Sequence, residues 1–194
     1  MSIAFPPPRS DVLAKRERVV AALQAIVPGE GVIAEENERR AFETDALTSY
    51  RRLPMVVVLP ETTEQVAAIL AFCHAEGVPV VARGAGTSLC GGSIPQEDAV
   101  VLGVAKMNRV LDTNFADRTM RVQAGITNLA ISGEVAHAGF FYAPDPSSQL
   151  ACTIAGNVAM NSGGAHCLKY GVTANNILGL KLVTVEGEIV EIGG

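Results

Sequence analysis

Residues 83–92 read Arg-Gly-Ala-Gly-Thr-Ser-Leu-Cys-Gly-Gly and directly follow a short apolar run, residues 79–82. Glycine tolerates positive φ angles and lets other groups approach the backbone closely. In such a loop several backbone N–H groups can point into one concavity and hold an anion, and the hydroxyls of Thr87 and Ser88 add donors. The stretch therefore predicts a strand followed by an anion-binding loop, with a simple glycine-rich connector as the alternative.

Two well-known phosphate-binding loops do not fit this spacing. Gly86 and Gly91 are spaced as in a P-loop, but Gly92 stands where that loop needs a lysine. A dinucleotide-binding fingerprint that starts at Gly84 would need its third glycine at Leu89. The loop also leads to a further strand rather than a helix, so a helix N-terminus that would hold a pyrophosphate is missing. The spacing indicates a loop whose own amides hold the anion.

The residues before the loop predict a strand, a helix and a second strand. Residues 55–59 form an unbroken apolar run, which is typical of a buried strand. Thr62 or Thr63 favours the start of a helix, and Gly77 favours its end. A helix that connects two strands of one sheet makes them parallel, so we expect parallel strands at 55–59 and 79–82.

Residues 1–53 are expected to form an N-terminal arm and a helical segment. Residues 1–10 contain three consecutive prolines, which cannot join a helix interior, so they are expected to be a loose arm. Ser10 and Asp11 are good N-cap residues for an amphipathic helix that Pro28-Gly29 ends. Residues 30–53 then predict a short strand or helix and a connector.

Strands and helices also follow the loop. We expect strands at 99–103, 110–114, 120–124, 177–185 and 188–192, and helices at 127–138 and 153–160. The fold class is therefore α+β. The domain at 54–194 is expected to contain a small α/β lobe at about 54–103 and a larger mixed lobe at about 104–194.

The composition excludes several classes of function. The formal net charge is −5 and there is no tryptophan, which argues against a nucleic-acid surface. The four cysteines form no CxxC pair, so we expect reduced thiols and no metal site. No apolar stretch is long enough to span a membrane, and the N-terminus lacks the apolar core of a signal peptide. We therefore expect a cytoplasmic protein, with any membrane association through partner subunits.

The loop and later segments together resemble a known family. These segments are Ala143-Pro144-Asp145-Pro146-Ser147-Ser148, Cys152-Thr153-Ile154-Ala155-Gly156-Asn157, Asn161-Ser162-Gly163-Gly164 and Lys169-Tyr170-Gly171. In this order they are similar to the FAD-binding domain of the vanillyl-alcohol-oxidase (PCMH-type) flavoproteins. Within that family the chain most resembles the glycolate oxidase D subunits and their FAD-dependent D-lactate dehydrogenase relatives, from about Val56 onward.

The resemblance implies a PCMH-type domain whose two α/β lobes hold the flavin between them. It implies FAD as cofactor, with residues 83–88 around the pyrophosphate and Thr153 capping a short helix whose free N–H groups favour an anion. No histidine stands in Gly86-Thr87-Ser88 to bind the flavin covalently, so we expect non-covalent FAD. The cofactor-binding residues it implies are Arg83, Gly84, Ala85, Gly86, Thr87, Ser88, Gly91, Pro144, Asp145, Ser148, Cys152, Thr153, Gly156, Asn157, Asn161, Gly163, Gly164, Tyr170 and Gly171.

The resemblance also implies a reaction, the oxidation of a 2-hydroxy acid such as glycolate or D-lactate by hydride transfer to flavin N5. His166 is a candidate acid/base group, but a base paired with a substrate-binding arginine is not evident in the sequence. The resemblance places those groups in a C-terminal substrate cap domain, which we expect to be absent from this chain. Other oxidase subunits, including an iron–sulfur subunit, are expected partners. An FAD-binding electron-transfer module and a non-catalytic anion-binding domain are the alternatives.

Overall fold

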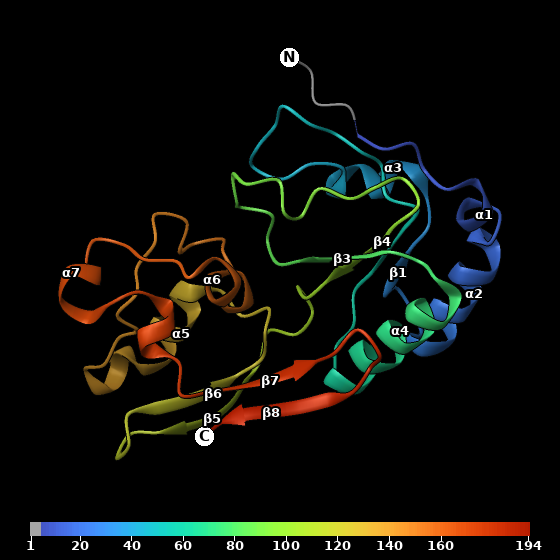
Figure 1. Ribbon diagram of the computed structural model, residues 1–194. Coiled ribbons are helices and arrows are strands. Elements are labelled where there is room, and N and C mark those ends of the chain that lie inside the picture. Colours follow the sequence, from blue (N-terminus) through green and yellow to red (C-terminus); the bar gives the residue numbers. More distant parts are fainter. Residues whose placement is uncertain (1–4) are drawn as a thin grey trace.

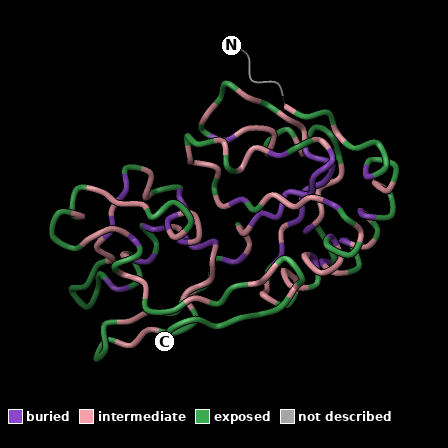
Figure 2. The backbone as a smooth tube through the Cα atoms, viewed as in Figure 1, coloured by how far each residue is buried: buried purple, intermediate pink, exposed green. Residues whose placement is uncertain are grey.

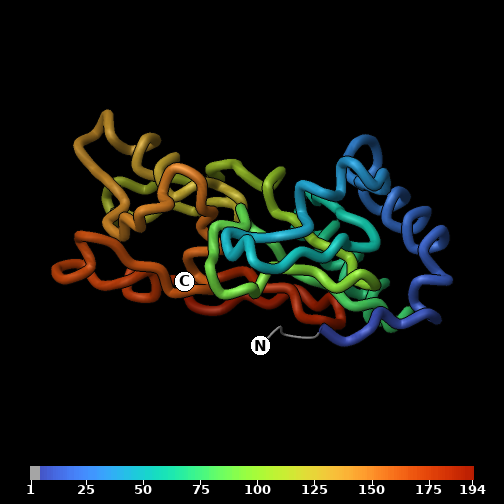
Figure 3. Tube along the Cα trace, turned by 90° about the horizontal axis from the view of Figure 1, so that it is seen from above, coloured from blue at the N-terminus to red at the C-terminus, as the bar shows by residue number. Residues whose placement is uncertain are grey.

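The computed structural model describes residues 5–194, so the first four residues of the predicted arm lie outside the described part. The chain folds into two lobes that lie side by side (Figures 1 and 3). The N-terminal helices occupy one end of the molecule, and the segments between residues 128 and 176 occupy the other (Figure 3). The fold is α+β with small, open sheets, as the sequence predicts.

The first lobe is built on a four-stranded sheet. Its strands are β1 (Val32–Ile33), β2 (Val56–Val58), β3 (Val80–Arg83) and β4 (Val100–Gly103), in the spatial order β1-β2-β4-β3. β4 pairs in parallel with both β2 and β3, whereas β1 is antiparallel to β2. β2 and β3 are thus parallel as predicted, but they do not pair with each other, because β4 lies between them and pairs with both.

Three helices pack into the same core as this sheet. They are α1 (Ser10–Leu13), α2 (Arg16–Ile26) and α4 (Thr63–Glu76). Val19 and Leu23 of α2 are fully buried with Val56, Val100 and Ile69. Figure 2 shows buried residues concentrated at this point. The helical segment before residue 54 therefore contributes to the hydrophobic core of the first lobe.

Local signals determine the ends of α4. The Thr62 hydroxyl accepts a hydrogen bond from the backbone N–H of Gln65 at 3.2 Å, which satisfies one of the free donors of the first turn. Gly77 ends the helix with φ +68°, a left-handed conformation that suits glycine. Both signals were read correctly from the sequence. Between α2 and β2 the chain forms α3 (Glu36–Arg39) and a 3-10 turn, η1 (Arg40–Phe42).

The second lobe is smaller in its core and richer in loops. Its elements are the antiparallel strands β5 (Val110–Asn114) and β6 (Thr119–Val122), the helices α5 (Asn128–Val135), α6 (Ile154–Met160) and α7 (Cys167–Tyr170), and the 3-10 turns η2 (Ala136–Ala138) and η3 (Thr173–Asn176). Ile126, Ile131 and Ile154 form its buried cluster. The predicted hairpin and helices are thus present, at slightly different bounds.

A C-terminal hairpin returns the chain to the first lobe. β7 (Gly179–Val183) and β8 (Ile189–Gly193) are antiparallel, and the hairpin runs toward α4 (Figure 1). Gly187 in the turn has φ +88°, and a side chain there would overlap with Ala67 and Ala71 of α4. Among residues 5–194, no helix combines the length and apolar character required to cross a bilayer.

Candidate functional site

The glycine loop, defined here as residues 84–92, leaves β3 at the carboxyl end of the parallel strands. Gly86 and Gly91 have φ angles of +71° and +74°, so both positions use the freedom of glycine. Within the described residues, the consecutive backbone N–H groups from Gly84 to Ser88 donate no hydrogen bond to another protein group. A row of unpaired amides at a left-handed turn is a binding site for an anion that offers several oxygens.

Arg83 lies beneath this loop. Its Nη1 donates to the carbonyl oxygen of Thr44 at 2.8 Å, and its Cζ lies 5.6 Å from the centre of the Phe42 ring. Burial lowers the pKa of Arg83, and the charge of Asp45 opposes that shift. Sequence reasoning missed Phe42, Thr44 and Asp45, which lie about 40 residues before the loop in no recognisable motif.

The glycine loop meets the second lobe at α6. A Cβ atom added to Gly84 would overlap with the hydroxyl of Thr153, so the loop backbone lies directly against that side chain. At the other end of α6, Ser88 Oγ is 4.0 Å from the sulfur of Met160. The structure thus brings together the glycine loop and the segment that begins at Cys152, as the resemblance implies.

Thr153 caps α6 as predicted, since its hydroxyl accepts the N–H of Gly156 at 3.2 Å. The expectation that free N–H groups remain at this helix end is wrong. Ile154 N–H donates to the carbonyl oxygen of Ile126 at 2.9 Å, and Ala155 N–H donates to that of Ala124 at 3.0 Å. The chain leading from β6 to α5 has already taken these donors. The glycine loop, and not the start of α6, therefore offers the unpaired amides, and α6 packs against that loop.

A buried amide network holds the segment at 143–148. Asn128 Nδ2 donates to the carbonyl oxygen of Pro144 at 3.0 Å and to Oδ1 of Asn157 at 2.9 Å. Asn157, only 2% exposed, in turn donates to the Cys152 sulfur at 3.2 Å. One buried hydrogen-bond network therefore joins three of the predicted site residues, Pro144, Cys152 and Asn157. Asn128 was missed because a lone asparagine in a helical pattern carries no functional signal.

Asp145 holds His166 through both carboxylate oxygens. Oδ1 accepts the backbone N–H of His166 and Oδ2 lies against its Nδ1, each at 3.0 Å. A side chain on Gly164 would overlap with the carbonyl and carboxylate of Asp145, which explains the glycine there. The His166 side chain is 53% exposed, and its ring lies near those of Phe141 and Tyr170. This pair presents an oriented imidazole at the surface of the second lobe.

The other predicted residues of the second lobe shape its loops. Asn161 ends α6 with φ +49°, and its Oδ1 accepts the N–H of Ala174 at 2.9 Å. The Ser148 carbonyl accepts the N–H of Cys152 at 2.8 Å. Gly163 and Gly171 lie where side chains would overlap with other parts of the chain. In the described residues, no hydrogen bond joins any of these four to the glycine loop.

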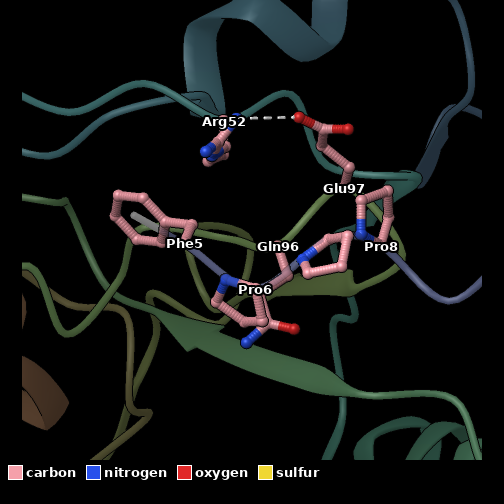
Figure 4. A pocket seen from close by; sticks show the side chains of 7 residues that line it. Phe5, Pro6, Pro8, Arg52, Gln96 and Glu97 are labelled. Atoms are coloured by element: carbon pink, nitrogen blue, oxygen red, sulfur yellow. Dashed lines mark hydrogen bonds and ion pairs between the residues drawn. The ribbon is translucent and has the colours of Figure 1, made fainter. Parts of the chain in front are cut away.

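Two surface hollows lie away from the glycine loop. The first, of about 80 Å³, is lined by Phe5, Pro6, Pro7, Pro8, Arg52, Gln96 and Glu97 (Figure 4). Arg52 bonds to Glu97 at 3.1 Å and lies over the Phe5 ring, so the hollow is a packing gap under the N-terminal arm. A cofactor pocket measures roughly 300–1,000 Å³, which makes it too small for a dinucleotide. The second, of about 400 Å³, is lined by Glu61, Ala105, Lys106, Asn108 and Arg109.

The described part of the chain contains no group of three or more histidine, cysteine or acidic side chains placed to hold a metal ion. The polar groups described above are the amides and hydroxyls of the glycine loop and, in the second lobe, the Asp145–His166 pair. Unpaired amides fit the oxygens of a diphosphate, which is the anionic part of a dinucleotide cofactor.

Comparison with known proteins identifies the cofactor. The chain is 51% identical over 178 residues to the glycolate oxidase subunit GlcD of Escherichia coli (strain K12), covering 92% of this chain and 36% of that protein. It is 37% identical to a D-lactate dehydrogenase of Archaeoglobus fulgidus, covering 80% of this chain and 35% of that protein. The chain thus spans about a third of the length of these curated relatives.

Solved protein structures share this fold. An alkyldihydroxyacetonephosphate synthase superposes with a TM-score of 0.82 at 22% identity, covering 98% of this chain and 36% of that one. The family model described as FAD binding domain matches residues 54–193, which include the glycine loop, the second lobe and the part of the first lobe from β2 onward. The chain therefore belongs to the FAD binding domain family, and its cofactor is FAD.

Proposed function

We propose that this chain is the FAD-binding portion of an enzyme that oxidises a 2-hydroxy acid, glycolate or D-lactate, to the 2-oxo acid. The observation that carries the proposal is the 51% identity to a glycolate oxidase subunit across nearly the whole chain. The similarity to a D-lactate dehydrogenase supports the same substrate class. The unpaired amides of the glycine loop supply the binding site that the cofactor diphosphate requires.

In this proposal FAD is bound without a covalent bond. Gly86, Thr87 and Ser88 offer no histidine at the position where some flavoproteins of this type attach the ring. Acid precipitation of the flavin-loaded protein tests this, because released flavin colours the supernatant. Yellow colour that stays in the pellet would contradict it.

The chain's own contribution to the reaction is proton handling at His166. When bound, FAD supplies the acceptor for the hydride that leaves C2 of the substrate. Asp145 engages Nδ1 of His166, so Nε2 is the nitrogen left to accept the hydroxyl proton. Replacing His166 with glutamine should lower the rate of flavin reduction by about 10²–10⁴-fold while leaving FAD affinity unchanged. If the glutamine variant reduced the flavin at the wild-type rate, His166 would have no role in the proton transfer.

The remaining substrate contacts are assigned to parts of the enzyme that this chain does not span. The relatives are roughly three times longer, and a substrate carboxylate needs a cation, usually arginine, to hold it. A substrate cap domain in the remainder of the enzyme would supply that group. Partner subunits, including an iron–sulfur subunit that accepts electrons, fit the subunit name of the Escherichia coli relative. A cytoplasmic location, with membrane attachment only through such partners, stays a prediction.

Anaerobic mixing of the flavin-loaded protein with substrate separates the candidate functions. Bleaching of the flavin band by glycolate or D-lactate, and not by L-lactate, is the expected result for the full-length enzyme. A full-length protein that binds FAD but is not bleached would be an electron-transfer module whose substrate site lies on another chain. A chain that binds no flavin would be a non-catalytic anion-binding domain, and the proposal would fail.

A further inference from the structure

Arg83 is the cation nearest to the glycine loop in sequence, yet its guanidinium is engaged within the protein. The residue is only 9% exposed. Nη1 donates to Thr44, and the guanidinium plane lies over Phe42. A Cβ atom on Gly86 would overlap with Nη2, so the guanidinium fills the space directly behind the loop. In this position the Arg83 side chain supports the loop backbone from the protein interior.

Asp45 lies in the segment that Arg83 contacts. Asp45 is 5% exposed, and its Oδ1 accepts the N–H of Leu47 at 2.8 Å, which fixes the turn at residues 45–47. Its Oδ2 is buried without a hydrogen-bond partner among the described residues. Burial lowers the pKa of Arg83, and the charge of Asp45 opposes that shift. Asp45 therefore shapes the segment that supports the loop and favours the charged form of Arg83.

The same short segment holds the backbone of the glycine loop. Ala46 N–H donates to the carbonyl oxygen of Gly86 at 2.9 Å, next to the bond between Arg83 and Thr44. The side chain of Leu47 lies close to Gly91. Residues 44–47 thus contact Arg83 just before the loop, Gly86 within it and the surroundings of Gly91 near its end. They lie outside residues 54–193, the range that the family model matches.

We propose that Asp45 and Arg83 are positioning residues for FAD. They hold the glycine loop in the shape that directs its amides at the diphosphate, and Arg83 does not serve as the counter-ion of the phosphates. The diphosphate is then held by the oriented amide dipoles of the loop. Residues 44–47 are consequently part of the cofactor site although they precede the recognised domain.

The test compares FAD dissociation constants of the wild-type chain with those of R83K, R83M and D45N over a range of salt concentrations. A positioning role predicts that all three variants bind FAD at least about tenfold more weakly. Lysine cannot bond to Thr44 and also lie flat over Phe42. The dependence of the dissociation constant on salt should be the same in wild type and R83M, because no phosphate counter-ion has been removed.

A counter-ion role predicts a different pattern. R83K would then bind nearly as well as wild type, the salt dependence would decrease in R83M, and D45N would bind more tightly. Any of these three results would overturn the proposal. Hydrogen exchange of the Ala46 amide gives a readout that needs no flavin, since its bond to Gly86 should lose protection in D45N and R83M. Retained protection in both variants would also overturn the proposal.

Asp98 offers a matched control in the same lobe. It is 1% exposed and pairs with Arg9 at 3.1 Å, away from the glycine loop. Asp98→Asn should lower the unfolding midpoint but leave the FAD dissociation constant within about twofold. If D98N weakened FAD binding as much as D45N, the effect of Asp45 would be one of general stability and the proposal would fail.

Discussion

The hydroxyl of Thr153 occupies the space that a side chain on Gly84 would need. Gly84 begins the glycine loop of the first lobe, and Thr153 caps α6 of the second. One contact therefore joins the loop to the helix cap beside the unpaired amides. Glycine at position 84 is required by this packing.

Gly84→Ala should weaken FAD binding by about tenfold or more, because its methyl group collides with Thr153 Oγ1. Overpacking of this kind typically costs about 1–3 kcal/mol. The measurement is a flavin titration followed by fluorescence quenching. The double variant G84A/T153A should regain much of the lost affinity, since the colliding hydroxyl is gone. If the second change gave no recovery, the contact would not be the cause.

Gly92→Ala is the control for that experiment. Gly92 lies in the same loop, but no atom stands within 4 Å of the position of an added Cβ. Its unfolding midpoint and FAD affinity should match those of wild type. A large loss of affinity in G92A would show that an added methyl group weakens binding without a collision, so the G84A result could not be assigned to Thr153.

Thr153→Ala should lower the free energy of unfolding by about 1 kcal/mol, the usual cost of losing a helix N-cap. The Gly156 N–H loses its acceptor in this variant, whereas Thr153→Ser keeps it. Urea denaturation of both variants measures the difference. Equal stability of T153A and wild type would mean that the cap contributes nothing to the second lobe.

Helix caps and strands of this chain were predictable because their causes are local. Thr62, Gly77 and Thr153 act on residues within one turn, so their sequence neighbours reveal them. The support of the glycine loop was not predictable, because residues 44–47 reach Arg83 and Gly86 only after β2, α4 and β3 have folded. The same holds for the position of β4 between β2 and β3.

Asn128→Ala should destabilise the protein by about 1–3 kcal/mol. The change leaves the Pro144 carbonyl oxygen and the Asn157 amide oxygen buried with one partner fewer. Thermal unfolding measures the loss, and the exposed Asn108 provides the control, since N108A should be neutral. An N128A variant as stable as N108A would show that the network is dispensable.

Cys73 gives the protein a stability that falls at high pH. Burial raises the pKa of its thiol from an ordinary value of 9.0 to about 12. Between these two values the unfolded chain loses the thiol proton while the folded chain keeps it. The free energy of unfolding should therefore be unaffected below pH 9 and fall by up to about 1.4 kcal/mol per pH unit above it. Cys73→Val removes this contribution, so parallel stability curves for wild type and C73V above pH 9 would contradict the assignment.

The most direct test of the site is an amide NMR titration of the ¹⁵N-labelled chain with FAD and, separately, with riboflavin, which lacks the diphosphate. The account predicts that the signals of Gly84, Ala85, Gly86, Thr87 and Ser88 shift on adding FAD and stay in place with riboflavin. If FAD bound while these five amides did not move, or if riboflavin moved them equally, the diphosphate would not be held by the glycine loop.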